Sequence, residues 1–262
     1  MKKILALLMS ILMIVACFAG CAKEEKTIVV GYTIYKPMNY LDESGKLVGY
    51  DTELAEAVFK NLGYKTIFKE IQWENKYTDL NSGTIDCIWN GFTCNTADDD
   101  GIQRAEKVDF SYNYMRNKQV IVVKNTANIA SAEDLKNKIG YSESGSAGES
   151  YAESFEGVIS KTAIKQTDCL VEVKAGTADF AVLDEQLAKS YCGNGDYADL
   201  KIVESLSSDV EFYAIGFKKG SALTAQVNAE LEKLGKDGTI KALAEKYGVS
   251  NTALTSFTAD EK

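Results

Sequence analysis

Two stretches of the chain place polar side chains directly after a short apolar run. Residues 174–185 read KAGTADFAVLDE and residues 81–93 read NSGTIDCIWNGFT, so both combine a Gly-Thr turn, an aspartate and an apolar strand. In an open parallel sheet, ligands bind beyond the carboxyl ends of the strands. We therefore expect Asp184 and the pair Asn90-Gly91 to face a cleft, one from each of two similar units. The alternative for Asp184 is a simple exposed strand end, an interpretation that suits its neighbour Glu185 better.

The chain contains no histidine. This removes the usual general base, the Ser-His-Asp triad and most zinc sites. No CxxC pair is present, and metal-ligand spacing is absent. A lysine or carboxylate enzyme stays open, but we expect a protein that is not an enzyme and needs no cofactor and no metal.

The first 20 residues are typical of a secretory signal. Lys2 and Lys3 precede an unbroken apolar stretch over residues 4–18, which is short for a membrane-spanning helix. Without those lysines the formal charge changes from −9 to −11, so an acidic chain with no basic cluster is a poor nucleic-acid binder. Export also permits disulfides. Cys169 and Cys192 could pair, whereas Cys87 reads as a small core residue, and Cys94 has no assigned role.

Apolar periodicity predicts an alternation of strands and helices. In the first half we expect strands over residues 27–32, 64–71 and 85–89, with helices over 51–63 and 75–80 between them. Asp51 is expected to cap the first helix. This order implies right-handed crossovers and a parallel sheet.

The second half repeats the pattern and then returns. We expect strands over 119–123, 139–141, 180–183 and 212–217, helices over 132–136, 148–155 and 168–174, and closing helices over 223–234 and 240–247. A second α/β unit is thus inserted into the first. Two extended segments, near 114–120 and 212–217, would connect them, which is typical of ligand-closing receptors.

At this point the chain resembles a known family, the extracellular solute-binding proteins of ABC importers that bind polar amino acids. Four stretches carry the resemblance: LVGYDTELAEAVFKNLG (residues 47–63), NSGTIDCIWNGFT, KAGTADFAVLDE and DGTIKALAEKYG (residues 237–248). It implies an α/β fold of the type 2 periplasmic-binding-protein class. Each lobe would be a mainly parallel sheet flanked by helices, and a two-segment hinge would join the lobes.

The resemblance also implies domain bounds and an anchor. Residues 1–20 would be a lipoprotein signal peptide, 21–26 a tether, 27–115 and 215–250 the first lobe, 116–214 the inserted lobe, and 251–262 a polar tail. The sequence FAGC before AKEEK resembles a lipobox, so Cys21 would be lipidated, with Cys17 in IVAC the alternative. The protein would then be exported and held on the outer face of the bacterial cell membrane.

The family's binding pattern carries over to named positions. Asp184 would take the ligand's α-ammonium, with Thr93 and the Gly91 carbonyl, while Arg104 would grip the α-carboxylate by two parallel bonds that lysine cannot provide. The insertion at residues 95–102 is expected to be a solvated loop; it doubles the family's spacing between Thr93 and Arg104, which leaves Arg116 as the fallback. The resemblance also implies Asn90 at the first strand end. It implies Gly145, Ser146 and the Ala147 backbone in a loop at a helix N-terminus, and Tyr35 and Trp73 beside the ligand side chain.

Because basic-amino-acid receptors tend to carry an acid near the first loop, Thr33 and Ile34 favour a neutral polar, aromatic or cystine-like ligand. The partners implied are a free amino acid, a membrane permease and the membrane itself, for a monomeric protein. Two other functions stay open: a ligand-sensing lipoprotein, and a dehydratase on the same fold, for which Glu143 would be the acid.

Overall fold

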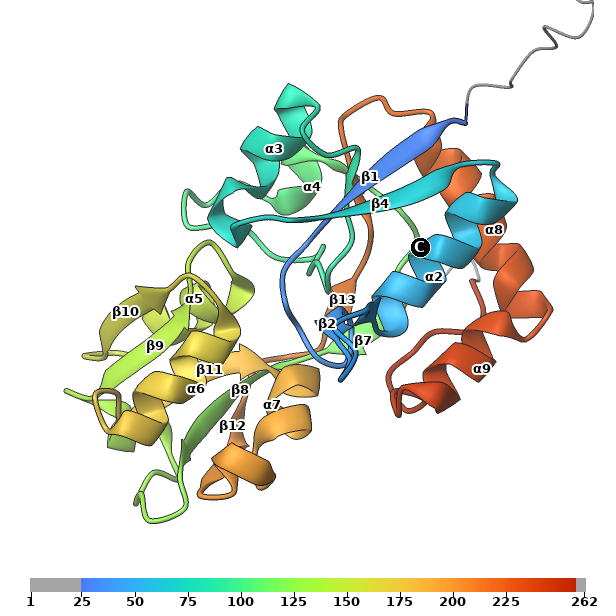
Figure 1. Ribbon diagram of the computed structural model, residues 1–262. Helices are drawn as coiled ribbons and strands as arrows, with labels where there is room; N and C mark the ends of the chain where they lie inside the picture. The colour runs from blue at the N-terminus through green and yellow to red at the C-terminus, as the bar shows by residue number, and fades with distance from the viewer. Residues whose placement is uncertain (1–24, 258–262) are drawn as a thin grey trace, which may run out of the picture.

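The computed structural model describes residues 25–257 and builds two lobes around two five-stranded sheets (Figure 1). This confirms the predicted α/β class with two sheet-containing lobes. The predicted signal peptide, Cys17, Cys21 and the end of the tail lie outside the described residues. None of the helices within residues 25–257 is long and apolar enough to span a membrane.

The first lobe contains a sheet with the strand order β4-β1-β5-β14-β6. Strands β1 (Thr27–Tyr32), β4 (Lys65–Glu70) and β5 (Cys87–Ile88) run parallel, as predicted. Strand β14 (Gly216–Phe217) pairs antiparallel with both β5 and β6 (Asp109–Phe110). The sheet is therefore completed by chain that returns from the second lobe.

Three amphipathic helices pack together on one side of this sheet. Helix α2 (Tyr50–Asn61) buries Leu54 and Val58, and contacts both α8 (Leu223–Lys236) and α9 (Thr239–Lys246) (Figure 1). Burying apolar side chains at helical spacing stabilises each helix against the sheet. The closing helices thus belong to the first lobe, although they are last in sequence.

Asp51 does not cap helix α2, contrary to the prediction. The cap is Gly49, whose φ of 134° and close contact with the Met38 carbonyl exclude a β-carbon there. Asp51 is the second helical residue and is fully buried; its Oδ2 accepts from the Gly91 N–H and the Tyr114 hydroxyl, each at 2.9 Å. The motif Gly-Tyr-Asp therefore anchors the loop after β5 rather than the helix end.

The second lobe has the strand order β10-β9-β11-β8-β12. Strands β9 (Ile139–Glu143), β10 (Ile159–Ala163) and β11 (Phe180–Asp184) are parallel, whereas β8 (Gln119–Lys124) runs antiparallel to β11 and to β12 (Leu200–Ser207). Strands β10 and β12 were not predicted. Both are edge strands, and their exposed residues do not form an apolar run.

Two short strands connect the lobes. Strand β7 (Met115–Asn117) pairs antiparallel with β13 (Glu211–Tyr213), and we call this pair the connector. The prediction of one strand over residues 212–217 is wrong, because the chain leaves β13 at Tyr213 and joins a different sheet at Gly216. The exact lobe boundaries at 115/116 and 214/215 stay predictions.

Shorter elements complete the chain: β2 (Tyr40–Leu41), β3 (Leu47–Val48), η1 (Trp73–Asn75), α3 (Lys76–Ser82), α4 (Arg104–Lys107), η2 (Ala132–Leu135), α5 (Ala147–Glu153), α6 (Gln166–Ala175), α7 (Glu185–Tyr191) and η3 (Gly195–Tyr197). The cysteine pair considered above does not form, because Cys169 and Cys192 are free thiols. Cys87 is buried in the core of the first lobe, as predicted.

Candidate ligand-binding site

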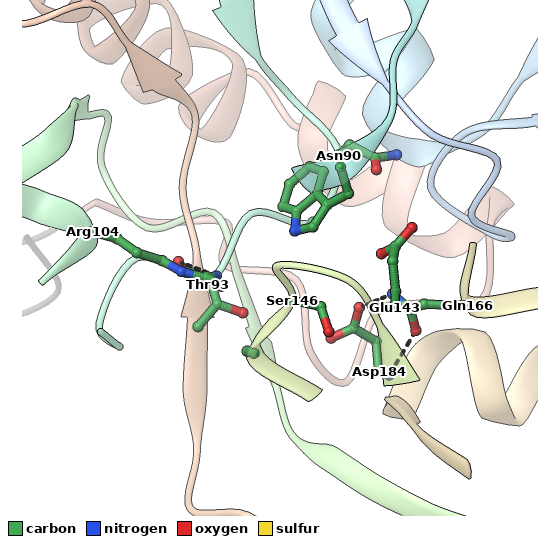
Figure 2. Close-up of a pocket in the computed structure, with 10 residues that line it drawn as sticks. Asn90, Thr93, Arg104, Glu143, Ser146, Gln166 and Asp184 are labelled. Carbon is green, nitrogen blue, oxygen red and sulfur yellow. Dashed lines mark hydrogen bonds between the residues drawn. The ribbon is translucent and has the colours of Figure 1, made fainter. Parts of the chain in front are cut away.

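The lobes enclose a small polar cavity where strands from both sheets end (Figure 2). The cavity has a volume of about 10 Å³, enough for roughly one water molecule. Its walls contain eight predicted site residues, Trp73, Asn90, Gly91, Thr93, Arg104, Ser146, Ala147 and Asp184, together with Glu143 and Gln166. The structure therefore brings together most of the residues that the resemblance selected, in a closed arrangement of the lobes.

Arg104, at the start of α4, supplies the positive charge of the cavity. Its side chain is 1% exposed and its guanidinium lies 5.4 Å from the centre of the Phe92 ring. The Nε atom donates to Asp98 at 2.7 Å, Nη1 donates to the Thr93 carbonyl at 3.2 Å, and Nη2 donates to the Gly145 carbonyl at 3.3 Å. An arginine has five N–H donors, so after these three bonds two remain for another acceptor. The fallback candidate Arg116 lies on the exposed side of β7 and does not line the cavity.

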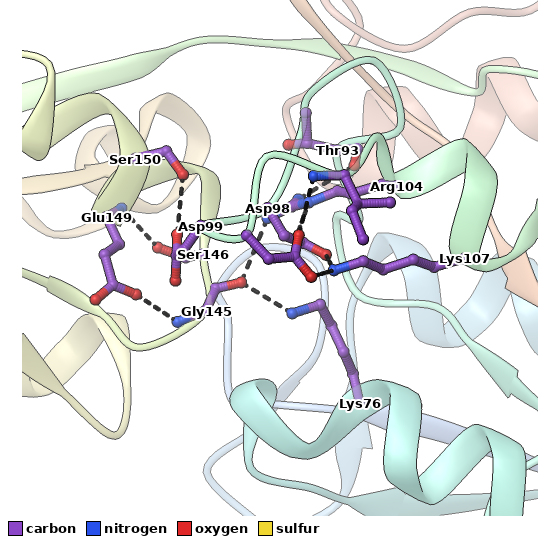
Figure 3. Close-up of polar contacts among 12 residues, drawn as sticks. Lys76, Thr93, Asp98, Asp99, Arg104, Lys107, Gly145, Ser146, Glu149 and Ser150 are labelled. Atoms are coloured by element: carbon purple, nitrogen blue, oxygen red, sulfur yellow. Dashed lines mark hydrogen bonds and ion pairs between the residues drawn. The ribbon is translucent and has the colours of Figure 1, made fainter.

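The inserted segment 95–102 was predicted to be a solvated loop, but one of its residues, Asp98, also holds Arg104 in place (Figure 3). Asp98 points inward with its side chain 11% exposed, and it pairs with both Arg104 and Lys107. Burial alone would raise the pKa of Asp98, but Arg104 and Lys107 outweigh burial and lower it to about 2. Asp98 therefore stays charged and orients the arginine.

Asp184 closes β11 and supplies an acid on the second lobe. Its carboxylate accepts from three neutral amides, those of Asn117 at 2.6 Å, Gln119 at 2.7 Å and Gln166 at 2.5 Å. Burial raises the pKa of Asp184, and these three amides together with the Tyr213 hydroxyl oppose the rise. Among residues 25–257, no lysine or arginine forms an ion pair with it, so its negative charge lacks a cation.

The loop after β5 forms the wall contributed by the first sheet. Gly91 has a φ of 58°, and a β-carbon there would lie 2.7 Å from Tyr35 Cε1. Tyr35 consequently lies behind Gly91, where its hydroxyl shares a 2.8 Å hydrogen bond with that of Tyr213, and it does not line the cavity. The Asn90 amide is occupied by Thr33 and Asn39, so it shapes the loop.

Thr93 completes that wall. Its hydroxyl donates to Glu211 Oε2 at 3.2 Å, which leaves oxygen lone pairs free to accept a hydrogen bond.

The Ser/Gly loop of the second lobe contacts the first lobe directly (Figure 3). The Gly145 carbonyl accepts from Lys76 Nζ at 2.9 Å as well as from Arg104, and Ser144 donates to Glu74 at 2.9 Å. Gly145 itself lies just outside the cavity, whereas Ser146 caps α5 by accepting from the Glu149 N–H. Burial and the neighbouring Arg104 lower the pKa of Lys76 to about 7.

Taken together, the cavity separates opposite charges onto different lobes. A buried cation with two unused donors faces a buried acid that has only neutral partners. Such a site fits a small dipolar guest whose negative end meets Arg104 and whose positive end meets Asp184. Within residues 25–257, no three cysteine, aspartate or glutamate side chains gather in a way that could hold a metal ion.

Comparison with known proteins decides the family. The profile described as "bacterial extracellular solute-binding proteins, family 3" matches residues 28–250. The chain belongs to this family. It is 28% identical to the arginine-binding extracellular protein ArtP of Bacillus subtilis, over 87% of this chain and 89% of ArtP. It is 29% identical to the L-cystine-binding protein TcyA of the same organism, over 94% and 97%.

A solved structure agrees with the family 3 fold. The arginine-, lysine-, histidine-binding protein ArtJ of Geobacillus stearothermophilus superposes with a TM-score of 0.76 at 29% identity, covering 85% of this chain and 95% of ArtJ. As a member of an extracellular solute-binding family, the chain is an exported protein.

The sequence did not predict one residue of this family 3 site, Gln166, and it suggested another, Glu143, only as an acid for catalysis. Gln166 begins α6 and both accepts from the Asp184 N–H and donates to its carboxylate. It follows the unpredicted edge strand β10, so no pattern marked it. Glu143 ends β9 and was considered only as an acid for catalysis. It is 3% exposed, and its Oε1 atom has no hydrogen-bond partner.

Proposed function

We propose that this family 3 protein captures a free polar α-amino acid between its two lobes and delivers it to the membrane permease of an ABC importer. The observation that carries the proposal is the cavity in which Arg104 of one lobe faces Asp184 of the other. Relatives named for binding arginine and L-cystine support the ligand class.

The mechanism follows from the placement of charge. The α-carboxylate would take the two free N–H donors of Arg104, and the α-ammonium would supply the cation that Asp184 lacks. A zwitterion makes both contacts at once only when the lobes are together. It therefore favours the closed state by its differential contacts.

The other proposed residues orient this head group. The Thr93 hydroxyl and the Gly91 carbonyl accept from the ammonium, and Ser146 and the Ala147 N–H approach the carboxylate from the second lobe. Trp73 lines the cavity beside the ligand side chain. Asn90 shapes the loop that forms the wall, and Gly145 and Tyr35 act from outside the cavity, through the contacts given above.

Delivery requires a position near the permease. We propose that residues 1–20 are removed, that Cys21 carries a lipid anchor, and that the two lobes act as a monomer at the outer face of the cell membrane. Two membrane-anchoring signals are usually needed for a stable association, which a multiply acylated cysteine would satisfy.

A thermal-shift screen against the twenty amino acids and cystine tests the proposal. A ligand that binds only the folded protein raises the melting temperature by mass action, by an amount that grows with concentration. Calorimetry on Arg104→Ala and Asp184→Ala should then show loss of binding, with Arg116→Ala as the matched control. If both variants kept the wild-type affinity, the site would be elsewhere.

Two other functions predict different results. A ligand-sensing lipoprotein would bind the same amino acid, and capture of a signalling receptor in place of a permease would identify it. An enzyme of the dehydratase type would need an acid beyond the binding set, and Glu143 lies in the cavity. We propose binding without catalysis; turnover of a small hydroxy or amino acid by the purified protein would contradict this.

A further inference from the structure

Glu143 is a cavity residue that the head group of an amino acid does not use. It ends β9, is 3% exposed and lines the cavity, yet its Oε1 atom has no hydrogen-bond partner. Among residues 25–257, no lysine or arginine forms an ion pair with it; Lys76 acts on it electrostatically but donates its hydrogen bond to Gly145. A buried polar atom without a partner is uncommon in folded proteins and calls for an explanation.

The position of Glu143 indicates which part of a ligand it meets. In Figure 2, Arg104 lies at one end of the cavity, Glu143 and Gln166 lie at the other, and Asp184 lies between them. The two charged groups of an α-amino acid are attached to one carbon, so both are placed once Arg104 and Asp184 are engaged. Whatever extends past Asp184 toward Glu143 is the ligand side chain.

The chemistry of that end is acidic. Asp184 and Glu143 are both buried there, and the positive charges, Arg104 and Lys76, belong to the opposite lobe. An apolar side chain would leave the Glu143 oxygen unpaired, whereas a cationic one would give it hydrogen bonds and a counter-charge.

We propose that Glu143 selects the ligand side chain and that the preferred ligand is an α-amino acid with a cationic side chain, such as arginine. The inference rests on the proposed function and narrows its substrate class. The prediction of a neutral ligand considered acids of the first loop alone, whereas this acid comes from the second lobe.

Proton release gives the inference an independent signature. Burial and the nearby Asp184 raise the pKa of Glu143 to about 8; Asp168 of α6 adds to the rise, while Lys76 of α3 and the Gln166 side chain oppose it. Glu143 is therefore largely protonated at neutral pH, and a cation that enters must displace this proton. A ligand with a neutral side chain has no such requirement.

Calorimetry with arginine and citrulline, which have similar length but differ in charge, tests the inference. We expect the wild-type protein to bind arginine about 30-fold or more tightly than citrulline, as for a buried charge pair. Glu143→Gln should remove most of this ratio by weakening arginine and leave citrulline within about threefold, since only the counter-charge is lost. Glu185→Gln is the matched control, because Glu185 pairs with Lys189 outside the cavity.

The outcomes separate the two proposals. Arginine binding in buffers of different ionisation enthalpy should release protons in the wild type and not in Glu143→Gln. If amino acids bind but citrulline or leucine binds as tightly as arginine, or if Glu143→Gln keeps the wild-type ratio, the inference on Glu143 is overturned and the proposed function stands. If no amino acid binds the wild type, both are overturned. The wild-type comparison needs no variant, so a variant that fails to fold does not remove the test.

Discussion

Replacing Asp184 by asparagine should separate binding from stability. The side chain keeps its size, but the charge that faces the cavity is lost. Among residues 25–257 this charge has three neutral amide donors and no cation as a partner. A ligand ammonium would therefore supply its full counter-charge. Two unit charges 3 Å apart attract by about 5.5 kcal/mol at an effective dielectric constant of about 20.

Desolvation offsets part of that attraction. Truncating one partner of a buried, hydrogen-bonded charge pair costs about 2–5 kcal/mol, so we expect Asp184→Asn to weaken amino-acid binding by about 30- to 4,000-fold. Stability should respond differently. Burial raises the pKa of Asp184, which means that the folded state disfavours its charge, and the neutral amide avoids this penalty. An opposing effect is that the new N–H₂ group must face one of the existing amide donors, which lowers the free energy of unfolding by about 1 kcal/mol.

The assay pairs calorimetry with urea unfolding at pH 7. The ligand is the amino acid with the largest thermal shift, and its analogue without the α-amino group is measured in parallel. In a double-mutant cycle, Asp184→Asn and the missing ammonium should not add, because both remove the same contact. Glu185→Gln controls for a change of charge nearby. Additive losses, or an affinity within about threefold of wild type, would refute the assignment, since a buried pair is worth more than this.

Three further predictions follow from other contacts. Arg104→Lys keeps the charge but loses the fork, so its affinity should fall between those of wild type and Arg104→Ala in calorimetry, while Arg116→Lys binds normally. Burial raises the pKa of Asp51 to about 7, so its contribution to stability is present below pH 4 and is lost as the pH rises to 7. Over that range, the free energy of unfolding measured with urea should fall for the wild type relative to Asp51→Asn, by up to about 1.4 kcal/mol per pH unit. If the free energies of the two proteins changed in parallel with pH, the prediction would be contradicted. Gly91→Ala should lower stability by about 1–3 kcal/mol, because it combines a positive φ with a contact to Tyr35; an unchanged melting temperature would show that the loop relaxes.

The two-lobed fold could be predicted because each buried strand is an apolar run with a turn before it. The edge strands β10 and β12 could not, since an edge strand need not be apolar. The break between β13 and β14 was also missed: residues 212–217 are uniformly apolar or small, and hydrophobicity does not show that a chain changes sheet. Asp51 was read as a cap because local preference cannot reveal that Gly91 and Tyr114 approach it from distant parts of the chain.

The candidate site shows the same limit. Arg104 and Asp184 carry motif neighbours that make them recognisable, and both line the cavity. Tyr35 matched an aromatic position by sequence but lies behind Gly91, since its hydroxyl pairs with Tyr213 from the connector. The role of Asp98 was hidden because an acidic run normally indicates solvent exposure. Its burial depends on the charge of Arg104, six residues later.

The connector strands couple closure of the lobes to the polar groups around Asp184. Asn117 of β7 donates to Asp184, and Glu211 of β13 accepts from both Thr93 and Gln119. Rotating one lobe against the other therefore has to rearrange the polar groups that surround the acceptor of the ligand's charge. Affinity and lobe angle are then two descriptions of a single equilibrium, and a substitution in either connector strand can change how tightly a guest is held without ever touching it.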